Sequence, residues 1–203
     1  MGSCPHAANG ASEREASLAK TTQPGKGCIM DVLEALQNRH SVRTYTGEPV
    51  SEENLKKVVQ AGLLSASGKH LCPWEFIVVR DHAMLEKLAG FRKVGAKMLA
   101  GADAAIVVLG DGDKSDVWVE DCSVVMANMH LEADSLGLGS VWVQGRVREA
   151  SDGRTAEEFA RELLGFPEHL HLEAVLALGM PESHPAPAEL DALAWAKVHS
   201  ERF

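Results

Sequence analysis

The sequence has few basic residues relative to its acidic ones. Lys and Arg total 20 against 29 Asp and Glu, which gives a formal net charge of -9. This balance argues against nucleic acid or an anionic membrane surface as a general partner. No apolar run approaches the length of a membrane span, and no signal-peptide pattern opens the chain. We therefore expect neither a nucleic-acid partner nor membrane association.

Cysteine is also scarce. The four cysteines, Cys4, Cys28, Cys72 and Cys122, are widely spaced and form no Cys-x-x-Cys pair. This pattern is typical of reduced thiols, so we expect a cytoplasmic protein. Cys4 and His6 could each bind a metal, but two ligands do not make a site. No metal site is expected.

The size and composition fit one domain. The chain has 203 residues, of which 45% are hydrophobic, enough to bury a sizeable core. Residues 1–28 are rich in Ala, Gly, Ser and Lys without an apolar period, so we predict a disordered or loosely packed tail. Residues 29–203 form the predicted domain.

Hydrophobic spacing and capping residues predict an alternation of helices and strands. Helices are expected over residues 31–38, 51–64, from 81, 117–136 and 155–164. Strands are expected over residues 75–80, 104–109, 140–145 and 172–178. Ser51 is a predicted N-cap, Thr155 and Glu158 form a predicted capping box, and Gly137 closes the longest helix. By itself this alternation favours a doubly wound parallel sheet.

The longest predicted helix has an apolar stripe at helical spacing. It consists of Cys122, Val125, Met126, Met129 and Ala133. A methionine-rich stripe of this kind is typical of core or of a subunit contact rather than of a cofactor site.

A cationic cluster, Arg39-His40-Ser41-Val42-Arg43, follows the first predicted helix. If the chain leaves the helix extended, residues 39, 41 and 43 share one face. Two guanidinium groups and a hydroxyl would then converge, a donor set that suits a phosphate monoester. The alternative is a solvated basic helix end that interacts favourably with the helix dipole.

A second notable stretch is Ser65-Ala66-Ser67-Gly68-Lys69-His70-Leu71-Cys72-Pro73-Trp74. Its small residues would allow the backbone to approach a ligand closely, and Pro73 prevents a helix from continuing. Taken alone, the run of serine and glycine is more typical of an ordinary loop.

Together these stretches resemble the FMN-dependent nitroreductase family. The Arg39–Arg43 cluster follows the first helix, and residues 65–74 resemble the family's Pro-Ser-x-x-Asn-x-Gln-Pro-Trp loop. Gly137-Leu138-Gly139-Ser140-Val141-Trp142 is similar to its helix-to-strand passage. Residues 163–168 and 178–181 are similar to its C-terminal portion. The resemblance extends from about residue 29 to the end of the chain.

The resemblance implies an α+β fold with a mixed, largely antiparallel sheet flanked by helices. It implies an intertwined homodimer with FMN at the subunit interface. It also implies an NAD(P)H oxidoreductase that uses NADH or NADPH as reductant. Such an enzyme passes hydride through the flavin in a ping-pong cycle and reduces nitroaromatics, quinones or similar electron-poor small-molecule acceptors. The flavin carries this chemistry, so no catalytic acid, base or nucleophile is expected from the protein.

The resemblance also assigns cofactor-binding residues. They are Arg39, His40, Ser41, Arg43, Ala66, Ser67, Gly68, His70, Gln144, Gly145 and Lys197. The cluster at 39–43 would bind the phosphate and ribityl chain, and the loop around Ser67 would approach from the partner subunit. Gln144 and Gly145 would lie beside the isoalloxazine, where a backbone N–H can reach N5. Lys197 would be a second cation for the phosphate.

Two positions depart from the family pattern. His70 stands where the family usually has Asn, and Cys72 where it usually has Gln. His70 is either a flavin contact or a structural histidine, and Cys72 is expected to be a packed thiol. Other functions stay open: a dehalogenating or flavin-modifying enzyme, a flavin-binding redox module, or a non-enzymatic dimer that binds another phosphate.

Overall fold

The computed structural model describes residues 31–203, and the expectations for the tail at 1–28, including Cys4, His6 and Cys28, lie outside this range. At its centre is a four-stranded sheet in the order β1-β2-β4-β3. The strands are β1 (Trp74–Val79), β2 (Ala104–Asp111), β3 (Gly139–Gln144) and β4 (Leu170–Gly179). Every neighbouring pair is antiparallel. The antiparallel sheet implied by the family resemblance is confirmed.

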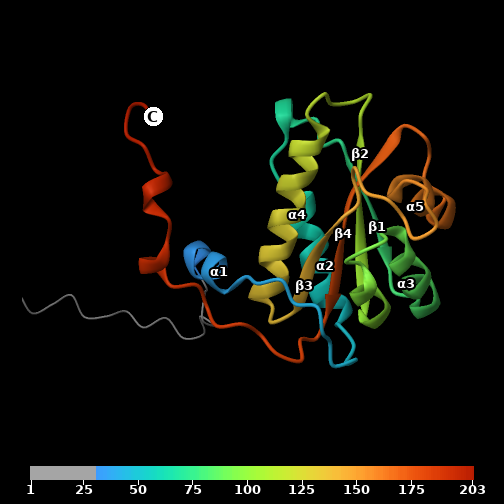
Figure 1. The fold of residues 1–203 in the computed structure, drawn as a ribbon, viewed down its shortest axis with the longest axis horizontal. Coiled ribbons are helices and arrows are strands. Elements are labelled where there is room, and N and C mark those ends of the chain that lie inside the picture. Colours follow the sequence, from blue (N-terminus) through green and yellow to red (C-terminus); the bar gives the residue numbers. More distant parts are fainter. Residues whose placement is uncertain (1–30) are drawn as a thin grey trace, which may run out of the picture.

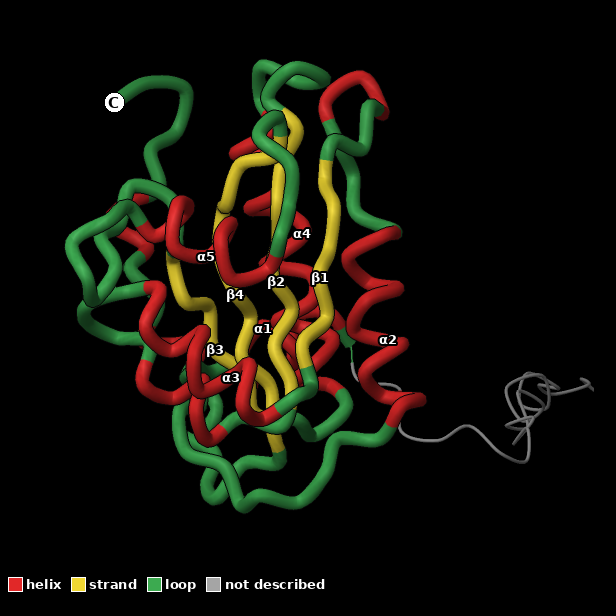
Figure 2. Tube along the Cα trace, turned by 90° about the vertical axis from the view of Figure 1, so that its right-hand side faces the viewer, coloured by secondary structure: helices red, strands yellow, loops and turns green. Residues whose placement is uncertain are grey.

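Helices cover both faces of the sheet (Figure 1). On one face lie α2 (Glu52–Leu63) and α4 (Trp118–Ser135), and on the other α3 (His82–Leu88) and α5 (Ala156–Leu164). The short helix α1 (Val32–Asn38) packs against α4. A view turned by 90° shows the strands between these two layers (Figure 2).

The two central strands, β2 and β4, have the continuous apolar sequences that are usual in parallel sheets. β2 and β4 are buried along almost their whole length because helices pack on both of their faces. Continuous apolar strands are typical of parallel sheets, but two-sided burial is what produces them. The parallel prediction is therefore wrong.

The helix ends lie where capping residues place them. The Ser51 side chain accepts a hydrogen bond from the Asn54 N–H at the start of α2. Thr155 and Glu158 form the predicted capping box of α5. Gly137, with a φ of 73°, follows α4 in the left-handed region that glycine tolerates. These predictions are confirmed.

The apolar stripe of α4 is core. Cys122, Val125, Met126, Met129 and Ala133 are all fully buried against the sheet and α2. They cannot contact a second subunit. Of the two alternatives for this stripe, the subunit contact is therefore wrong, because the sheet already covers these side chains.

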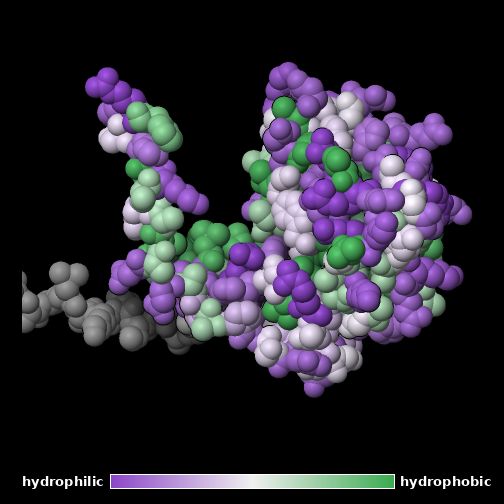
Figure 3. Space-filling view, viewed as in Figure 1, coloured by the Kyte–Doolittle hydropathy of each residue, from purple (hydrophilic) through white to green (hydrophobic). Residues whose placement is uncertain are grey.

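The chain beyond β4 projects from the body, with α1 between the tail and the sheet (Figure 1). Hydrophobic side chains gather over α1 and the tail in the space-filling view (Figure 3). They include Val32, Leu33, Leu36 and Leu193, which are all exposed. Within residues 31–203, no helix has the length and apolar character needed to cross a membrane.

Candidate functional site

The Arg39–Arg43 segment is extended and attached to the first residues of β3. The helix α1 ends at Asn38, and Ser41 forms an isolated parallel bridge with Ser140. The Val42 N–H donates to the Ser140 carbonyl at 2.9 Å, and the Val42 side chain is buried. Arg39 and Ser41 are half-buried, whereas Arg43 is exposed. The extended backbone, which was the condition for residues 39, 41 and 43 to share one face, is therefore present.

The guanidinium of Arg39 reaches back to helix α4. Its Nη1 lies 3.1 Å from Nε2 of His130, and Nδ1 of the same ring lies 2.5 Å from Oγ of Ser140. Burial, and secondarily the charge of Arg39, lower the pKa of His130 to about 4. The imidazole is therefore neutral under ordinary conditions.

These residues fit a phosphate. Among residues 31–203, neither Arg39 nor Arg43 pairs with a carboxylate, although acidic residues outnumber basic ones in the chain. The contacts of Arg39 and Arg43 are neutral acceptors, the His130 ring and the Ser41 carbonyl. Two arginines whose charge is not cancelled, beside a serine hydroxyl, form a donor set for an anion.

His184 connects the C-terminal tail to the same region. Nε2 of His184 lies 2.8 Å from Oδ1 of Asp134, which follows His130 by one turn of α4. The His40 ring lies edge-on to the His184 ring. The Ala188 N–H donates to the Gln37 carbonyl at 2.9 Å, and Nε2 of Gln37 donates to the Ala188 carbonyl at 3.0 Å. Helices α1 and α4 therefore both anchor the start of the tail.

This anchor is expected to weaken as pH rises. The hydrogen bond to Asp134 raises the pKa of His184 above its ordinary value. A raised histidine pKa stabilises the docked tail fully below about pH 6.5, and the effect disappears as pH rises through the higher native value. We expect a contribution on the order of 1 kcal/mol or less for this partly exposed pair. Hydrogen-exchange protection of the Ala188 amide should fall over that window.

The substitution His184→Asn supplies the control. It removes the titrating group, so protection of the Ala188 amide should be lower at acidic pH and independent of pH. Equal pH dependence in wild type and His184→Asn would show that the Asp134 pair does not hold the tail.

Gln144 and Gly145 lie at the other end of β3. The N–H groups of Gly145 and Arg146 both donate to the Glu173 carbonyl, at 3.0 Å and 2.9 Å. Nε2 of Gln144 donates to the same carbonyl and to Oε1 of Glu173. A β-bulge leaves Glu173 without a partner in β2. The bulge thus fixes the turn that the family resemblance places beside the flavin ring.

Burial of the Glu173 carboxyl group is energetically unfavourable. Among the described residues, its Oε2 is the one buried side-chain nitrogen or oxygen without a hydrogen bond. Burial raises the pKa of this carboxyl, while the Gln144 hydrogen bond opposes the shift. A carboxyl whose native pKa is raised stabilises the fold less as pH rises above its unfolded value.

Replacing Glu173 with leucine should therefore stabilise the protein at neutral pH. The expected gain in unfolding free energy is roughly 1–3 kcal/mol, the cost of an unsatisfied buried polar group. In the leucine variant, Nε2 of Gln144 can still donate to the main-chain carbonyl of residue 173. The gain should shrink near pH 4, where wild-type Glu173 is protonated. Urea unfolding of both proteins at pH 7 and pH 4 measures this, and a loss of stability at pH 7 would contradict it.

The loop at residues 65–73 lies near the start of α4. The Gly68 N–H donates to Oδ1 of Asp121 at 2.7 Å, and the Ser67 hydroxyl accepts from the Cys72 N–H at 2.9 Å. His70 and Cys72 both have positive φ values, 57° and 46°. The His70 side chain is exposed and Cys72 is half-buried. Backbone strain of this kind concentrates at functional sites.

The predicted residues form separate groups within one chain. The Arg39 cluster and Gln144 lie at opposite ends of β3, roughly 13 Å apart at the usual rise of a strand. The loop at 65–73 leads into β1, which is separated from β3 by roughly 14 Å across the sheet. Lys197 lies in the short helix Trp195–Lys197 of the projecting tail. One chain therefore does not bring all eleven residues together.

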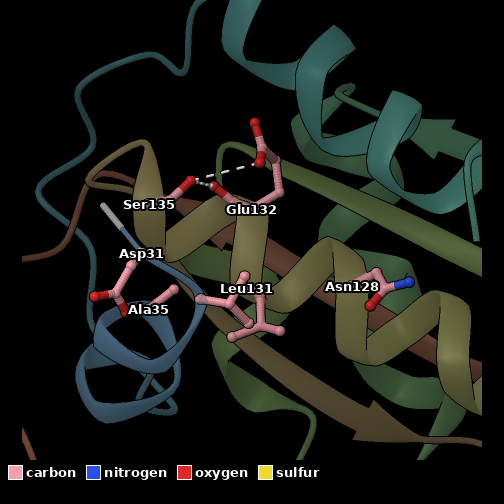
Figure 4. Close-up of a pocket in the computed structure, with 7 residues that line it drawn as sticks. Asp31, Ala35, Asn128, Leu131, Glu132 and Ser135 are labelled. Atoms are coloured by element: carbon pink, nitrogen blue, oxygen red, sulfur yellow. Dashed lines mark hydrogen bonds between the residues drawn. The ribbon is translucent and has the colours of Figure 1, made fainter. Parts of the chain in front are cut away.

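A shallow pocket of about 240 Å³ lies where α1 packs on α4 (Figure 4). Its lining residues are Asp31, Val32, Ala35, Asn128, Leu131, Glu132 and Ser135. Asp31 and Glu132 make it unsuitable for a phosphate, since two carboxylates repel an anion. The pocket is therefore distinct in chemistry from the Arg39 cluster.

Comparison with known proteins decides the family. The model of the nitroreductase family matches residues 36–93 and 86–180, more than half of the chain. The chain belongs to the nitroreductase family. An Archaeoglobus fulgidus protein provisionally named NADH dehydrogenase/NAD(P)H nitroreductase is 39% identical over 156 residues, 75% of this chain and 86% of that protein. A Methanothermobacter thermautotrophicus protein with the same provisional name is 38% identical, over 82% of this chain and 85% of its own length.

Solved structures of nitroreductases share the fold. An FMN-dependent nitroreductase from Clostridium difficile has a TM-score of 0.81 and 37% identity, covering 84% of this chain and 99% of that one. A provisionally named nitroreductase from Desulfovibrio desulfuricans, solved in complex with FMN, has a TM-score of 0.68 and 27% identity, covering 84% and 96%. The nitroreductase fold implied by the sequence resemblance is thereby confirmed.

Sequence reasoning missed the residues that support this site. His130 and Asp134 lie four residues apart on the buried face of α4, and Glu173 lies within a buried strand. Polar residues on an otherwise apolar face require partners, which is the signal that could have identified them. Their partners lie on other elements: Arg39 and Ser140 for His130, His184 for Asp134, and Gln144 for Glu173. The sequence alone does not show which residues of different elements pair.

Proposed function

We propose that this nitroreductase-family protein is an FMN-dependent oxidoreductase. It uses NADH or NADPH to reduce electron-poor small molecules such as nitroaromatics or quinones. The observation that carries the proposal is the pair Arg39 and Arg43, held beside Ser41 without a carboxylate partner among residues 31–203. In a family whose solved members include an FMN complex, this donor set suits the flavin phosphate.

The protein's own residues bind and orient the cofactor. Arg39, Ser41 and Arg43 hold the phosphate, and His40 lies beside the ribityl chain. The turn at Gln144 and Gly145 faces the isoalloxazine, which supplies the hydride transfer when bound. The Glu173 carbonyl holds this turn by three hydrogen bonds, so its position is set before a ligand arrives.

The working unit in this proposal is a homodimer. Residues 66–70 and the Gln144 turn lie on opposite edges of one sheet, so a second copy has to supply the loop to each flavin. The outer face of α4 carries the exposed Val124, and the exposed Val117 immediately precedes the helix, while the inner face of α4 is core. The partner would also receive the tail that carries Lys197. The scarce, widely spaced cysteines favour a cytoplasmic location.

Anaerobic spectroscopy tests this function. The purified protein should be yellow, and NADH or NADPH should bleach the flavin absorbance rapidly. Adding a quinone or a nitroaromatic compound should restore it. A colourless protein that binds no FMN would contradict the proposal, and a bound flavin that neither nicotinamide bleaches would favour a flavin-binding redox module instead. Loss of halide from a haloaromatic acceptor would identify a dehalogenating member.

A further inference from the structure

His130 is a buried polar residue on a helix whose inner face is otherwise largely apolar. Only 4% of the residue is exposed, and the other buried residues of α4 include Met126 and Met129. Burying an imidazole is unfavourable unless both ring nitrogens find partners. Both do: Nε2 contacts Arg39 at 3.1 Å and Nδ1 contacts Ser140 at 2.5 Å.

The identity of the partners fixes the tautomer. A guanidinium only donates hydrogen bonds, so Nε2 of His130 must be the acceptor and Nδ1 must carry the proton. The Nδ1–H then donates to the Ser140 hydroxyl oxygen. Because Arg39 and burial both disfavour the imidazolium, the ring stays neutral, although Asp134 acts in the opposite direction.

This arrangement fixes Arg39 without cancelling its charge. A carboxylate in place of His130 would also hold the guanidinium, but it would neutralise it and repel an incoming phosphate. A neutral acceptor leaves the full positive charge available, together with the remaining N–H donors of the fork. The Arg39–Arg43 segment is linked to Ser140 in two ways. Arg39 reaches it through the His130 ring, and the Val42 N–H donates to the Ser140 carbonyl.

We propose that His130 is a positioning residue that holds the Arg39 guanidinium, uncompensated and oriented, for the phosphate of the flavin. This inference rests on the proposed function, because it needs the phosphate to bind at Arg39. His130 itself does not touch the cofactor. Its effect is to order a long, flexible side chain before binding, so that less conformational freedom is lost when the phosphate arrives.

The test compares FMN with riboflavin, which lacks the phosphate. The full-length protein is dialysed to exchange its flavin, and both affinities are measured by flavin fluorescence for wild type, His130→Leu, His130→Gln and His130→Glu. We expect His130→Leu to weaken FMN binding roughly tenfold, as for a lost charge-assisted hydrogen bond, and to leave riboflavin binding within about twofold. Unchanged riboflavin affinity shows that the variant is folded.

The other two variants separate orientation from charge. His130→Gln keeps a neutral acceptor and should recover most of the FMN affinity. His130→Glu keeps an acceptor but neutralises Arg39, so it should weaken FMN binding at least as much as leucine does. Wild-type FMN affinity in His130→Leu, or an equal loss for FMN and riboflavin, would overturn the inference.

Arg39→Ala distinguishes this inference from the function on which it rests. If Arg39→Ala weakens FMN binding and His130→Leu does not, the phosphate site stands and the role of His130 fails. If Arg39→Ala binds FMN like wild type, the phosphate assignment itself fails. In the double variant Arg39→Ala/His130→Leu, the second change should add no further loss, because His130 acts only through Arg39.

Discussion

Replacing Arg39 with alanine is expected to weaken FMN binding by roughly 1.5–3 kcal/mol, about 10- to 150-fold, the range for a hydrogen bond to a charged group. The reason is that Arg39 is half-buried and already oriented by His130, so its charge reaches the phosphate with little screening. Arg43→Ala should weaken binding in the same direction. It should do so less strongly, since Arg43 is exposed.

Arg154→Ala is the matched control for this experiment. It removes the same charge, but Arg154 is paired with the carboxylates of Asp152 and Glu162. Its loss should leave FMN affinity unchanged. Equilibrium titration with flavin fluorescence measures all three variants, and wild-type affinity in both Arg39→Ala and Arg43→Ala would refute the phosphate site.

A glutamate at Val124 is expected to separate the subunits and release the flavin. Val124 lies on the outer face of α4, 42% exposed in one chain, on the side away from the sheet. A two-fold interface would contain the substitution twice, so two carboxylates would lose their hydration in an apolar contact. We expect the dimer dissociation constant to rise by roughly 100-fold or more, about 2.7 kcal/mol.

Val78→Glu is the corresponding control. Val78 is similarly exposed, at 43%, but lies on strand β1 instead of on α4. It should leave assembly intact. Sedimentation velocity at micromolar concentration, followed through the flavin absorbance, distinguishes the variants. A Val124→Glu protein that sediments as a yellow dimer would exclude this face of α4, and a stable yellow wild-type monomer would exclude the dimer altogether.

Local structure was predictable because its causes are local. Ser51, Asp81 and Thr155 cap the helices that they precede, through hydrogen bonds to an N–H three residues later. Strand order was not predictable, because neighbouring strands such as β2 and β4 are separated in the chain by three further elements.

The candidate site was predictable only where it is a local motif. The Arg39–Arg43 cluster and the Gln144 turn were identified from their residues and the family resemblance. The residues that hold them in place were not identified, because they belong to pairs that are distant in sequence, such as Arg39 with His130 and Gln144 with Glu173. Whether Lys197 and residues 66–70 join the same site depends on a second chain, and it stays a prediction.

A crystal structure of the FMN-loaded protein tests the central claim most directly. It should show a phosphate oxygen within roughly 3.2 Å of the Arg39 guanidinium and of the Ser41 hydroxyl. The flavin ring should lie between Gly145 of one subunit and residues 66–70 of the other. A phosphate bound away from Arg39, or a flavin enclosed by a single subunit, would contradict the account.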